Sequence, residues 1–374
     1  MIKVLVLDTV MDRGGAETMI MNYMRNINRN EISFDFLTNR DYRAAYEDEI
    51  ESLGGKVYHM SPQLPGHFRQ YKKEMKNFLK EHPEYRIIHS NLEERSYLPL
   101  KIAKKMGVPV RISHAHNRPL GFDIKTIVRY YFRWRLKGVN THMFACGYEA
   151  GDWLYGKKSR DKVILINNAI DAKEYAYNPE KSIEIKKKLG IEGKTVIGHV
   201  GRFFTQKNHP FLIDIFKSIH DKDPNTVLLL VGGGESDDAL KNKMKEKVKT
   251  LGLEESVQFL GVRNDVADIL QAFDLFLLPS LYEVLPVTMI EAQASGLPCV
   301  ISDKVPIQCD ITGNTKVVSL ETSTDKWADI VLNYAEKFNR TNTFEKIRKA
   351  GFDIKENAKW LEGFYKELSN GKEQ

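Results

Sequence analysis

The sequence predicts an α/β protein made of two doubly wound parallel sheets, each covered by helices. Short apolar runs of strand length alternate with helical stretches along the whole chain, a pattern typical of parallel sheets with helices on both faces. A chain of 374 residues also exceeds one average domain and favours two of roughly 150 to 200 residues. The alternation restarts near the charged, glycine-punctuated passage Ile183–Gly193, so the junction is expected at about 173–192.

Seven short apolar runs in the first half are expected to be strands. They are Lys3–Leu7, Phe34–Leu37, Lys56–Tyr58, Ile87–His89, Val110–Ser113, Met143–Cys146 and Val163–Ile166. Helical stretches are expected between them at Ala16–Ile27, around Ile50–Leu53 and at Arg69–Lys80.

Six further strand-like runs follow in the second half. They are Thr195–His199, Val227–Val231, Val257–Leu260, Leu275–Leu278, Cys299–Ser302 and Thr315–Val318, with helices at Pro210–His220, Asp237–Thr250 and Val266–Gln271. The end of the chain has helical apolar spacing from Trp360 to Leu368, which predicts a C-terminal helix at about 356–374 that packs back on the first domain. The expected domains are therefore 1–175 and 176–355, with ligands at the carboxyl ends of their strands.

The composition favours a soluble, cytoplasmic protein. Hydrophobic residues make up 42% and charged residues 28% of the chain, which is the balance of a globular protein. No apolar run approaches the roughly 20 residues of a membrane span, and the N-terminus resembles a first strand rather than a signal peptide. The three cysteines, Cys146, Cys299 and Cys309, form no close pair and are expected to be buried thiols.

Basic residues are concentrated in the first half of the chain. Residues 1–172 contain 28 basic and 20 acidic side chains, whereas 173–374 contain 28 and 30. The excess is greatest in 118–137, where six cations alternate with aromatic and apolar residues and Asp123 is the one acid. Such a helix can lie on an anionic membrane surface at the inner face of the cell membrane. The alternative is a solvated helix whose aromatics are in the core. Nucleic-acid binding is not expected, because no recognised reading motif accompanies the patch.

The most informative motif is a predicted strand-to-helix turn that contains two glutamates. The apolar run that ends at Pro279 precedes Glu283, and a helix is expected from Pro286 past Glu291 to a stop at Gly296. The N–H groups at the helix start, near Val287 and Thr288, favour a phosphate. The two carboxylates would then meet different parts of one extended ligand, which predicts a pocket for a nucleotide sugar.

Two motifs in the first half also follow predicted strands. Gly14 and Gly15 open the Ala16–Ile27 helix, where paired glycines allow close approach to a phosphate or oxyanion; a plain tight turn is the alternative. His116 follows the Val110 strand and can bond a sugar hydroxyl or developing charge. Zinc ligation by His114 and His116 is a weaker alternative, because no nearby Cys or further His completes a site.

Three features of the second half complete the pattern. Arg202 and Lys207 follow its first strand beside a glycine-containing turn, and two cations there suit a diphosphate leaving group; a solvated surface loop is the alternative. The glycine run Gly232–Gly234 would let the backbone approach a nucleoside closely. Asp221 and Asp223 have the D-x-D spacing of metal-dependent transferases, but they fall at the amino edge of the sheet, so no metal is expected.

Taken in order, Gly14-Gly15, His116, Arg202, Lys207 and the Glu283/Glu291 pair resemble the retaining glycosyltransferases of family 4. This resemblance covers essentially the full length and is closest to bacterial capsule, exopolysaccharide and lipopolysaccharide enzymes. It implies the GT-B fold, in which two Rossmann-like domains face each other across a cleft. It also implies that the C-terminal domain binds a nucleoside-diphosphate sugar, most commonly a UDP-sugar, and that the N-terminal domain binds a glycan or lipid-linked acceptor.

The resemblance also implies residue roles. Arg202 and Lys207 would grip the diphosphate, Glu291 would accept hydrogen bonds from the ribose, Glu283 would contact the donor sugar, and His116 would lie near its anomeric carbon. Gly15 would let its loop close over the phosphates, the loop at Val262 and Arg263 would meet the base, and Gly234, Leu285, Pro286, Val287 and Thr288 would complete the donor site. The sequence departs from many relatives at Val284, where they have glycine, and this residue can narrow the accepted donors.

The chemistry implied is metal-independent transfer with retention, through an oxocarbenium-like transition state. Because Glu291 is expected on the ribose, a front-face reaction is favoured, in which leaving-group phosphate helps to deprotonate the acceptor hydroxyl. The sequence leaves two alternatives open: a nucleotide-sugar epimerase, and a non-catalytic nucleotide-binding scaffold in polysaccharide assembly.

Overall fold

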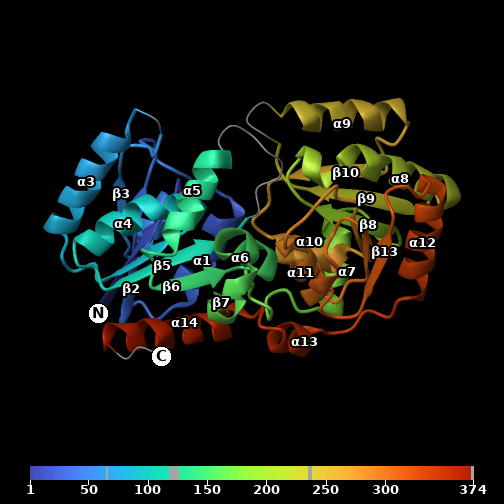
Figure 1. The fold of residues 1–374 in the computed structure, drawn as a ribbon. Helices are drawn as coiled ribbons and strands as arrows, with labels where there is room; N and C mark the ends of the chain where they lie inside the picture. The colour runs from blue at the N-terminus through green and yellow to red at the C-terminus, as the bar shows by residue number, and fades with distance from the viewer. Residues whose placement is uncertain (65, 118–125, 235–237, 372–374) are drawn as a thin grey trace. The chain divides into compact units, whose positions relative to one another are not determined.

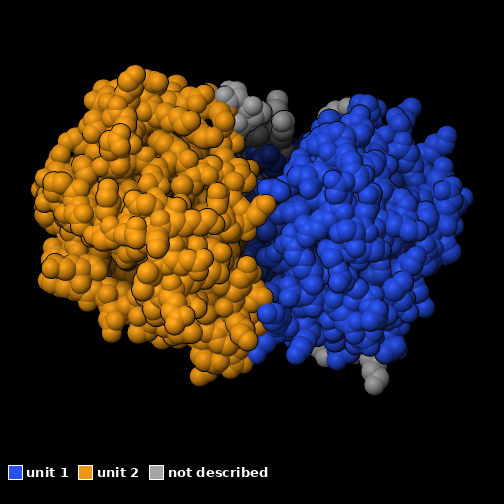
Figure 2. Space-filling view, turned by 180° about the vertical axis from the view of Figure 1, so that it is seen from behind, with its two compact units in different colours: residues 1–169, 354–374 blue, residues 170–353 orange. Residues whose placement is uncertain are grey.

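The computed structural model describes all residues except 65, 118–125, 235–237 and 372–374. The chain forms two compact units, residues 1–169 with 354–374, and residues 170–353 (Figure 2). Each unit contains a parallel sheet with helices on its faces (Figure 1). The predicted fold class is confirmed, and each of the thirteen runs expected to be strands overlaps a strand in the described part of the chain.

Unit 1 contains a seven-stranded parallel sheet in the order β3-β2-β1-β4-β5-β6-β7. Its strands are β1 (Ile2–Leu7), β2 (Ile32–Thr38), β3 (Val57–His59), β4 (Ile87–Ser90), β5 (Val110–Ala115), β6 (His142–Ala145) and β7 (Val163–Leu165). Its helices are α1 (Gly15–Asn26), α2 (Glu47–Ser52), α3 (Phe68–Glu81), α4 (Tyr97–Lys105), α5 (Thr126–Leu136), α6 (Tyr148–Tyr155) and α14 (Ile354–Ser369), with 3-10 turns at Glu93–Ser96 and Lys157–Lys162.

Two cores cover the two faces of this sheet. On one face, α1 and α14 pack over Phe34, Phe36 and Phe144, and α14 contributes Leu361 and Tyr365. This is the apolar spacing that predicts a packed C-terminal helix. On the other face, α3, α4 and α6 cover Leu5, Leu7 and Ile88, among others. Strands buried on both faces read as continuous apolar runs, which is why sequence pattern alone found them.

Unit 2 contains a six-stranded parallel sheet in the order β10-β9-β8-β11-β12-β13. Its strands are β8 (Thr195–Val200), β9 (Thr226–Val231), β10 (Val257–Gly261), β11 (Leu275–Leu278), β12 (Cys299–Ser302) and β13 (Thr315–Val318). Its helices are α7 (Pro179–Lys188), α8 (His209–Lys222), α9 (Ala239–Thr250), α10 (Val266–Ala272), α11 (Val287–Ala294), α12 (Thr324–Lys337) and α13 (Phe344–Lys349), with 3-10 turns at Thr205–Lys207 and Ile307–Cys309.

Sequence pattern missed several helices, among them α4, α6, α7, α12 and α13. The expected start of α9 at Asp237 lies outside the described residues. The prediction for the cysteines holds, since all three are free and buried. In both units the loops after adjacent strands meet at the carboxyl edge of the sheet, and these loops carry most of the predicted site residues.

Candidate functional site

In unit 2, Glu283 is held by three side chains in the loop between β11 and α11. Lys207 Nζ donates to Oε1 of Glu283 at 2.7 Å, and Ser280 Oγ donates to the same oxygen at 2.8 Å. Gln206 Nε2 donates to Oε2 at 2.9 Å. The Glu283 side chain is only 6% exposed. The contacts join the loop after β8 to the loop after β11, so the two predicted residues lie together.

The second glutamate, Glu291, lies on α11 and contacts a residue that sequence pattern did not single out. The hydroxyl of Tyr175 donates to Oε1 of Glu291 at 3.0 Å. Burial raises the pKa of Glu291 to about 7, although the Tyr175 hydrogen bond and the charge of Lys207 both lower it. The carboxyl group therefore changes its protonation state close to neutral pH. No local motif marks Tyr175, because it is 116 residues from its partner.

The start of α11 presents groups suited to an anion. Pro286 is the N-cap residue, and Val287 and Thr288 form the first turn, whose N–H groups have no acceptor within a helix. The hydroxyl of Thr288 is buried and has no partner among the described residues. An anion at this helix start would be favoured by both the free N–H groups and the helix dipole.

Glycines bring the turns after β8 and β9 close together. A Cβ on Gly232 would lie 2.1 Å from the carbonyl oxygen of Gly201, so no larger residue fits there. The N–H of Phe203 donates to the carbonyl of Gly233 at 2.8 Å. Arg202 lies in this turn and is exposed. It therefore lies one strand away from the β11 loop that carries Glu283.

The remaining predicted residues of unit 2 lie along the same edge. A Cβ on Gly234 would lie 2.1 Å from Oδ1 of Asp238. Val262, directly after β10, is 63% exposed, whereas Arg263 is paired with Asp265 at 2.6 Å. Because β10, β9, β8 and β11 are neighbours in the sheet, the structure brings the predicted residues of unit 2 to four adjacent loops.

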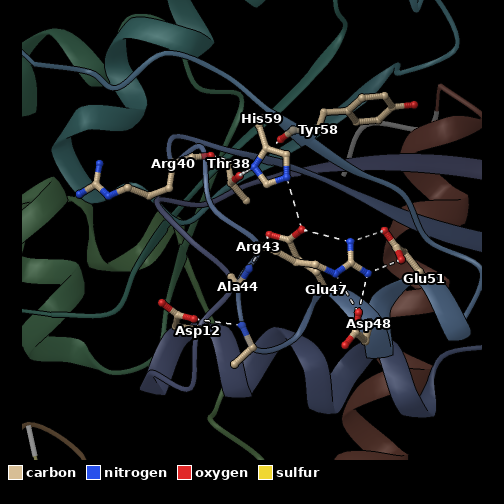
Figure 3. Close-up of polar contacts among 11 residues, drawn as sticks. Asp12, Thr38, Arg40, Arg43, Ala44, Glu47, Asp48, Glu51, Tyr58 and His59 are labelled. Atoms are coloured by element: carbon tan, nitrogen blue, oxygen red, sulfur yellow. Dashed lines mark hydrogen bonds and ion pairs between the residues drawn. The ribbon is translucent and has the colours of Figure 1, made fainter. Parts of the chain in front are cut away.

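In unit 1, the turn at Gly14 and Gly15 is anchored by Asp12. Gly14 is the N-cap residue of α1, and a Cβ on Gly15 would meet no atom within 4 Å. Asp12 accepts hydrogen bonds from the N–H of Ala45 at 3.0 Å (Figure 3) and from the hydroxyl of Tyr42 at 2.7 Å. The glycine turn thus begins beside a carboxylate that the loop after β2 holds in place.

That loop is itself held by Glu47, a buried carboxylate at the start of α2. Glu47 Oε1 accepts the N–H of Ala44 at 2.9 Å. Its Oε2 lies 3.3 Å from Nε2 of His59 and 3.9 Å from the guanidinium of Arg43 (Figure 3). Arg43 in turn pairs with Asp48 and Glu51. The network ties the ends of β2 and β3 to α2.

His116 follows β5 and is nearly buried, with 7% of its surface exposed. Its Nε2 lies 3.0 Å from Oδ1 of Asn91, the residue after β4, so Nε2 donates and Nδ1 is left as an acceptor. Nδ1 has no partner among the described residues. Burial lowers the pKa of His116 to about 3, so this imidazole is neutral at physiological pH and can accept a ligand hydroxyl.

The zinc alternative for His114 and His116 finds no support in their geometry. Their ring centroids lie 4.0 Å apart with the ring planes tilted by 33°, and Nδ1 of His114 lies 3.0 Å from Nε2 of His89. Within the described residues, no group of three His, Cys, Asp or Glu side chains could hold a metal. Of the D-x-D pair, Asp221 binds Lys217 and Asp223 accepts the N–H of Asn225.

Comparisons with known proteins define the family. Residues 13–174 match the family model for Glycosyltransferase Family 4, and residues 181–350 match the model for Glycosyl transferases group 1. The putative glycosyltransferase EpsF of Bacillus subtilis is 34% identical over 95% of this chain and 94% of its own length. The capsular polysaccharide biosynthesis glycosyltransferase CapH of Staphylococcus aureus is 26% identical over 92% and 95%, respectively.

Among solved structures, HepE of Anabaena in complex with UDP superposes with a TM-score of 0.80 at 19% identity, covering 98% of this chain and 100% of that one. That likeness supports the GT-B fold. The chain belongs to glycosyltransferase family 4. It is a nucleotide-sugar glycosyltransferase of the hexosyltransferase type.

Proposed function

We propose that this enzyme transfers a sugar from a UDP-sugar, with retention of configuration and without a metal, to a glycan or lipid-linked glycan in cell-surface polysaccharide synthesis. The observation that carries the proposal is the cluster of Lys207, Glu283, Glu291 and the start of α11 at one sheet edge of unit 2. CapH supports the polysaccharide role, and the UDP complex of HepE supports the choice of base.

The donor would lie along this edge from nucleoside to sugar. Glu291 accepts the ribose hydroxyls, while Arg202, Lys207 and the N–H groups at the start of α11 neutralise the diphosphate. Val262, Arg263 and Gly234 meet the nucleoside. Glu283, fixed by three hydrogen bonds, contacts the sugar together with the backbone from Leu285 to Thr288.

The chemical step needs charge stabilisation at the leaving group. As the glycosidic bond to the diphosphate breaks, negative charge grows on the β-phosphate and positive charge grows on the sugar ring. Arg202 and Lys207 stabilise the phosphate. An oxygen of the leaving phosphate takes the proton from the attacking hydroxyl of the acceptor substrate, on the same face of the sugar. Within unit 1, the neutral His116 would accept a hydrogen bond from a sugar hydroxyl, and the turn at Gly14 and Gly15 would bind phosphate.

The test is a thermal-shift panel of nucleoside diphosphates and nucleotide sugars, with and without Mg²⁺. One UDP-sugar should raise Tm selectively and equally in EDTA, and Glu291→Ala should abolish the shift. The donor so identified is then incubated with lipid-linked glycan acceptors, and the anomeric configuration of the product is read by NMR. A free epimer released from the donor alone would identify an epimerase, and binding without turnover would identify a scaffold.

We also propose that unit 1 contacts an anionic membrane through 118–137, of which α5 is the described part. Phe132 packs against the core, but the exposure of the other aromatic side chains of α5 supports this proposal over the alternative in which the aromatics lie in the core. Trp134 and Ile127 are 68% and 69% exposed, and Tyr130 and Tyr131 are about half exposed. An exposed apolar and aromatic face with nearby cations is what an interfacial helix presents. No helix in the described part of the chain is long and apolar enough to cross a membrane.

A groove beside α5 adds cations to this face. It is lined by Lys72 and Lys76 of α3, by Lys101 and Lys105 of α4, and by apolar side chains that include Phe132. Lysines one turn apart on a helix repel each other, and none of these four has an acidic partner within 4 Å among the described residues. Lipid phosphates would relieve that repulsion.

These contacts decide which variants test the membrane proposal. Arg133 donates to backbone carbonyls of α6, and Arg135 donates to Tyr97, so replacing them would disturb the fold.

Three variants test the membrane proposal by their binding to phosphatidylglycerol vesicles. Each should bind about tenfold or more weakly than wild type: Lys72→Gln/Lys76→Gln, Lys101→Gln/Lys105→Gln, and Trp134→Ser alone. The control pair Lys243→Gln/Lys249→Gln, on exposed positions of α9, should bind like wild type. Unchanged binding by all three test variants would refute the proposal.

A further inference from the structure

Glu93 has a backbone conformation that a glutamate rarely adopts. It follows β4 and opens the 3-10 turn Glu93–Ser96 with φ of +51°. Among the described residues, the other non-glycine residues with positive φ are Asn208 and Asp238, both of types that tolerate this region. A left-handed glutamate costs about 1–2 kcal/mol, and glycine is the usual residue there. The presence of a glutamate at this strained position indicates that its side chain has a role.

The Glu93 carboxyl group supports the loop that carries His116. Its Oε1 accepts the N–H of His116 at 2.8 Å and the N–H of Asn117 at 3.0 Å. Two residues earlier in the same turn, Asn91 holds the His116 ring at Nε2. The turn after β4 therefore holds His116 by two sets of hydrogen bonds: Glu93 binds its backbone, and Asn91 binds its ring. Nδ1 of the ring remains as a free acceptor among the described residues.

The second oxygen of Glu93 gives an independent sign of function. Oε2 is buried and has no hydrogen-bond partner among the described residues. Burial, with a contribution from the charge of Glu94, raises the pKa of Glu93 to about 8. When the carboxyl group is neutral, Oε1 still accepts the two N–H groups, and no negative charge is buried at the unpartnered Oε2.

We propose that Glu93 is a positioning residue for His116, holding the backbone after β5 so that Asn91 can fix the neutral Nε2–H tautomer with Nδ1 directed to a ligand hydroxyl. The functional part rests on the role proposed for His116. The structural part does not, because it concerns the bonds from Glu93 to the loop.

Three variants separate the side chain from the strained backbone. Glu93→Gly relieves the strain and removes the carboxyl group, Glu93→Ala keeps the strain and removes the carboxyl group, and Glu93→Gln keeps an acceptor oxygen. If the backbone conformation alone mattered, the loop at His116 would be at least as well ordered in Glu93→Gly as in wild type. If the hydrogen bonds from the loop to the Glu93 carboxyl group matter, the Gly and Ala variants should both lose the ordered loop at His116, and Glu93→Gln should retain it.

The first readout is amide hydrogen exchange in the full-length protein. In the Gly and Ala variants, the amides of His116 and Asn117 should exchange at least tenfold faster than in wild type, and in Glu93→Gln they should stay protected. The amide of Val196, which donates to Asp274 in unit 2 at 2.8 Å, is the internal control and should not change. Unchanged protection of His116 and Asn117 in Glu93→Gly would overturn the proposal.

The second readout is the His116 ring, followed by ¹⁵N NMR of histidine-labelled protein. Wild type and Glu93→Gln should show a single Nε2–H tautomer, and Glu93→Gly should show a mixture; a single tautomer in all three would overturn the proposal. UDP-glucose turnover is measured in parallel, and its kcat should fall about tenfold in the Gly variant while the UDP-induced Tm shift stays unchanged. If wild type turns over no UDP-sugar, the proposed function fails while both readouts still decide the role of Glu93.

Discussion

Lys207 Nζ lies 2.7 Å from Oε1 of Glu283, which places a cation assigned to phosphate in direct contact with a carboxylate assigned to sugar. Both side chains are largely buried, 15% and 6% exposed. Ser280 and Gln206 also hold Glu283, so its position does not depend on Lys207 alone. The two residues should therefore be separable by mutation.

Lys207→Met should weaken UDP binding about 10- to 100-fold, because a charge-assisted hydrogen bond contributes about 1.5–3 kcal/mol. Glu283→Gln should leave UDP affinity within about threefold of wild type and lower turnover of the UDP-sugar about 100-fold. Calorimetric titration with UDP and steady-state kinetics measure the two effects. Lys304→Gln, an exposed change on the same unit, is the control. Equal loss of UDP affinity in both site variants would contradict the separation.

Donor affinity should depend on pH through Glu291. Its pKa is raised to about 7 by burial, and the carboxylate form is the better acceptor for ribose hydroxyls. Affinity for UDP-glucose should be constant well above pH 7 and fall as pH drops below it, by up to tenfold per unit. Tyr175→Phe removes a hydrogen bond that lowers this pKa, so the midpoint should move upward. UDP-glucose is the ligand to titrate, since its diphosphate does not change charge in this range. Glu291→Gln should bind weakly and without this pH dependence.

Stability should fall with rising pH because of Glu93. Its pKa is raised to about 8 in the folded state from about 4.3 in an unfolded chain. Between these values the unfolded state binds fewer protons, so increasing pH favours unfolding. Glu93→Gln should therefore raise Tm relative to wild type by roughly 10 °C at pH 8 and by little at pH 4.5. Parallel Tm profiles of the two proteins would contradict this.

Gly198 in β8 should tolerate no side chain. A Cβ there would lie 1.9 Å from the ring of Phe273, which is fully buried. Gly198→Ala should destabilise unit 2 by about 3 kcal/mol through overpacking, and Phe273→Leu should partly rescue it. Gly363→Ala is the matched control, because a Cβ in that part of α14 meets nothing within 4 Å and alanine favours a helix by about 1 kcal/mol. Denaturant unfolding measures both.

Local pattern was sufficient for much of the fold and for several site residues. The strands are buried on both faces, so their apolar runs are visible without knowledge of their neighbours. The strand, proline and glycine around Glu283 and Glu291 likewise mark a strand-to-helix turn. Helices such as α4 and α12 were not predicted, although their apolar residues recur at helical spacing as they do in α1 and α8.

Apolar periodicity and motif spacing were enough to predict two parallel α/β sheets, the loops after their strands and the chemical types of side chain in those loops. Which of these side chains are in contact depends on how the chain packs in three dimensions. Tyr175 contacts Glu291 across 116 residues, and Glu93 contacts the backbone of His116 from the turn that follows the neighbouring strand β4. The packing of α5 also leaves Tyr130, Tyr131 and Trp134 exposed, whereas Phe132 packs against the core. The physical reason is that strand propensity acts between nearby residues, whereas burial, pKa and hydrogen-bond partners depend on neighbours that the order of strands in the sheet brings together.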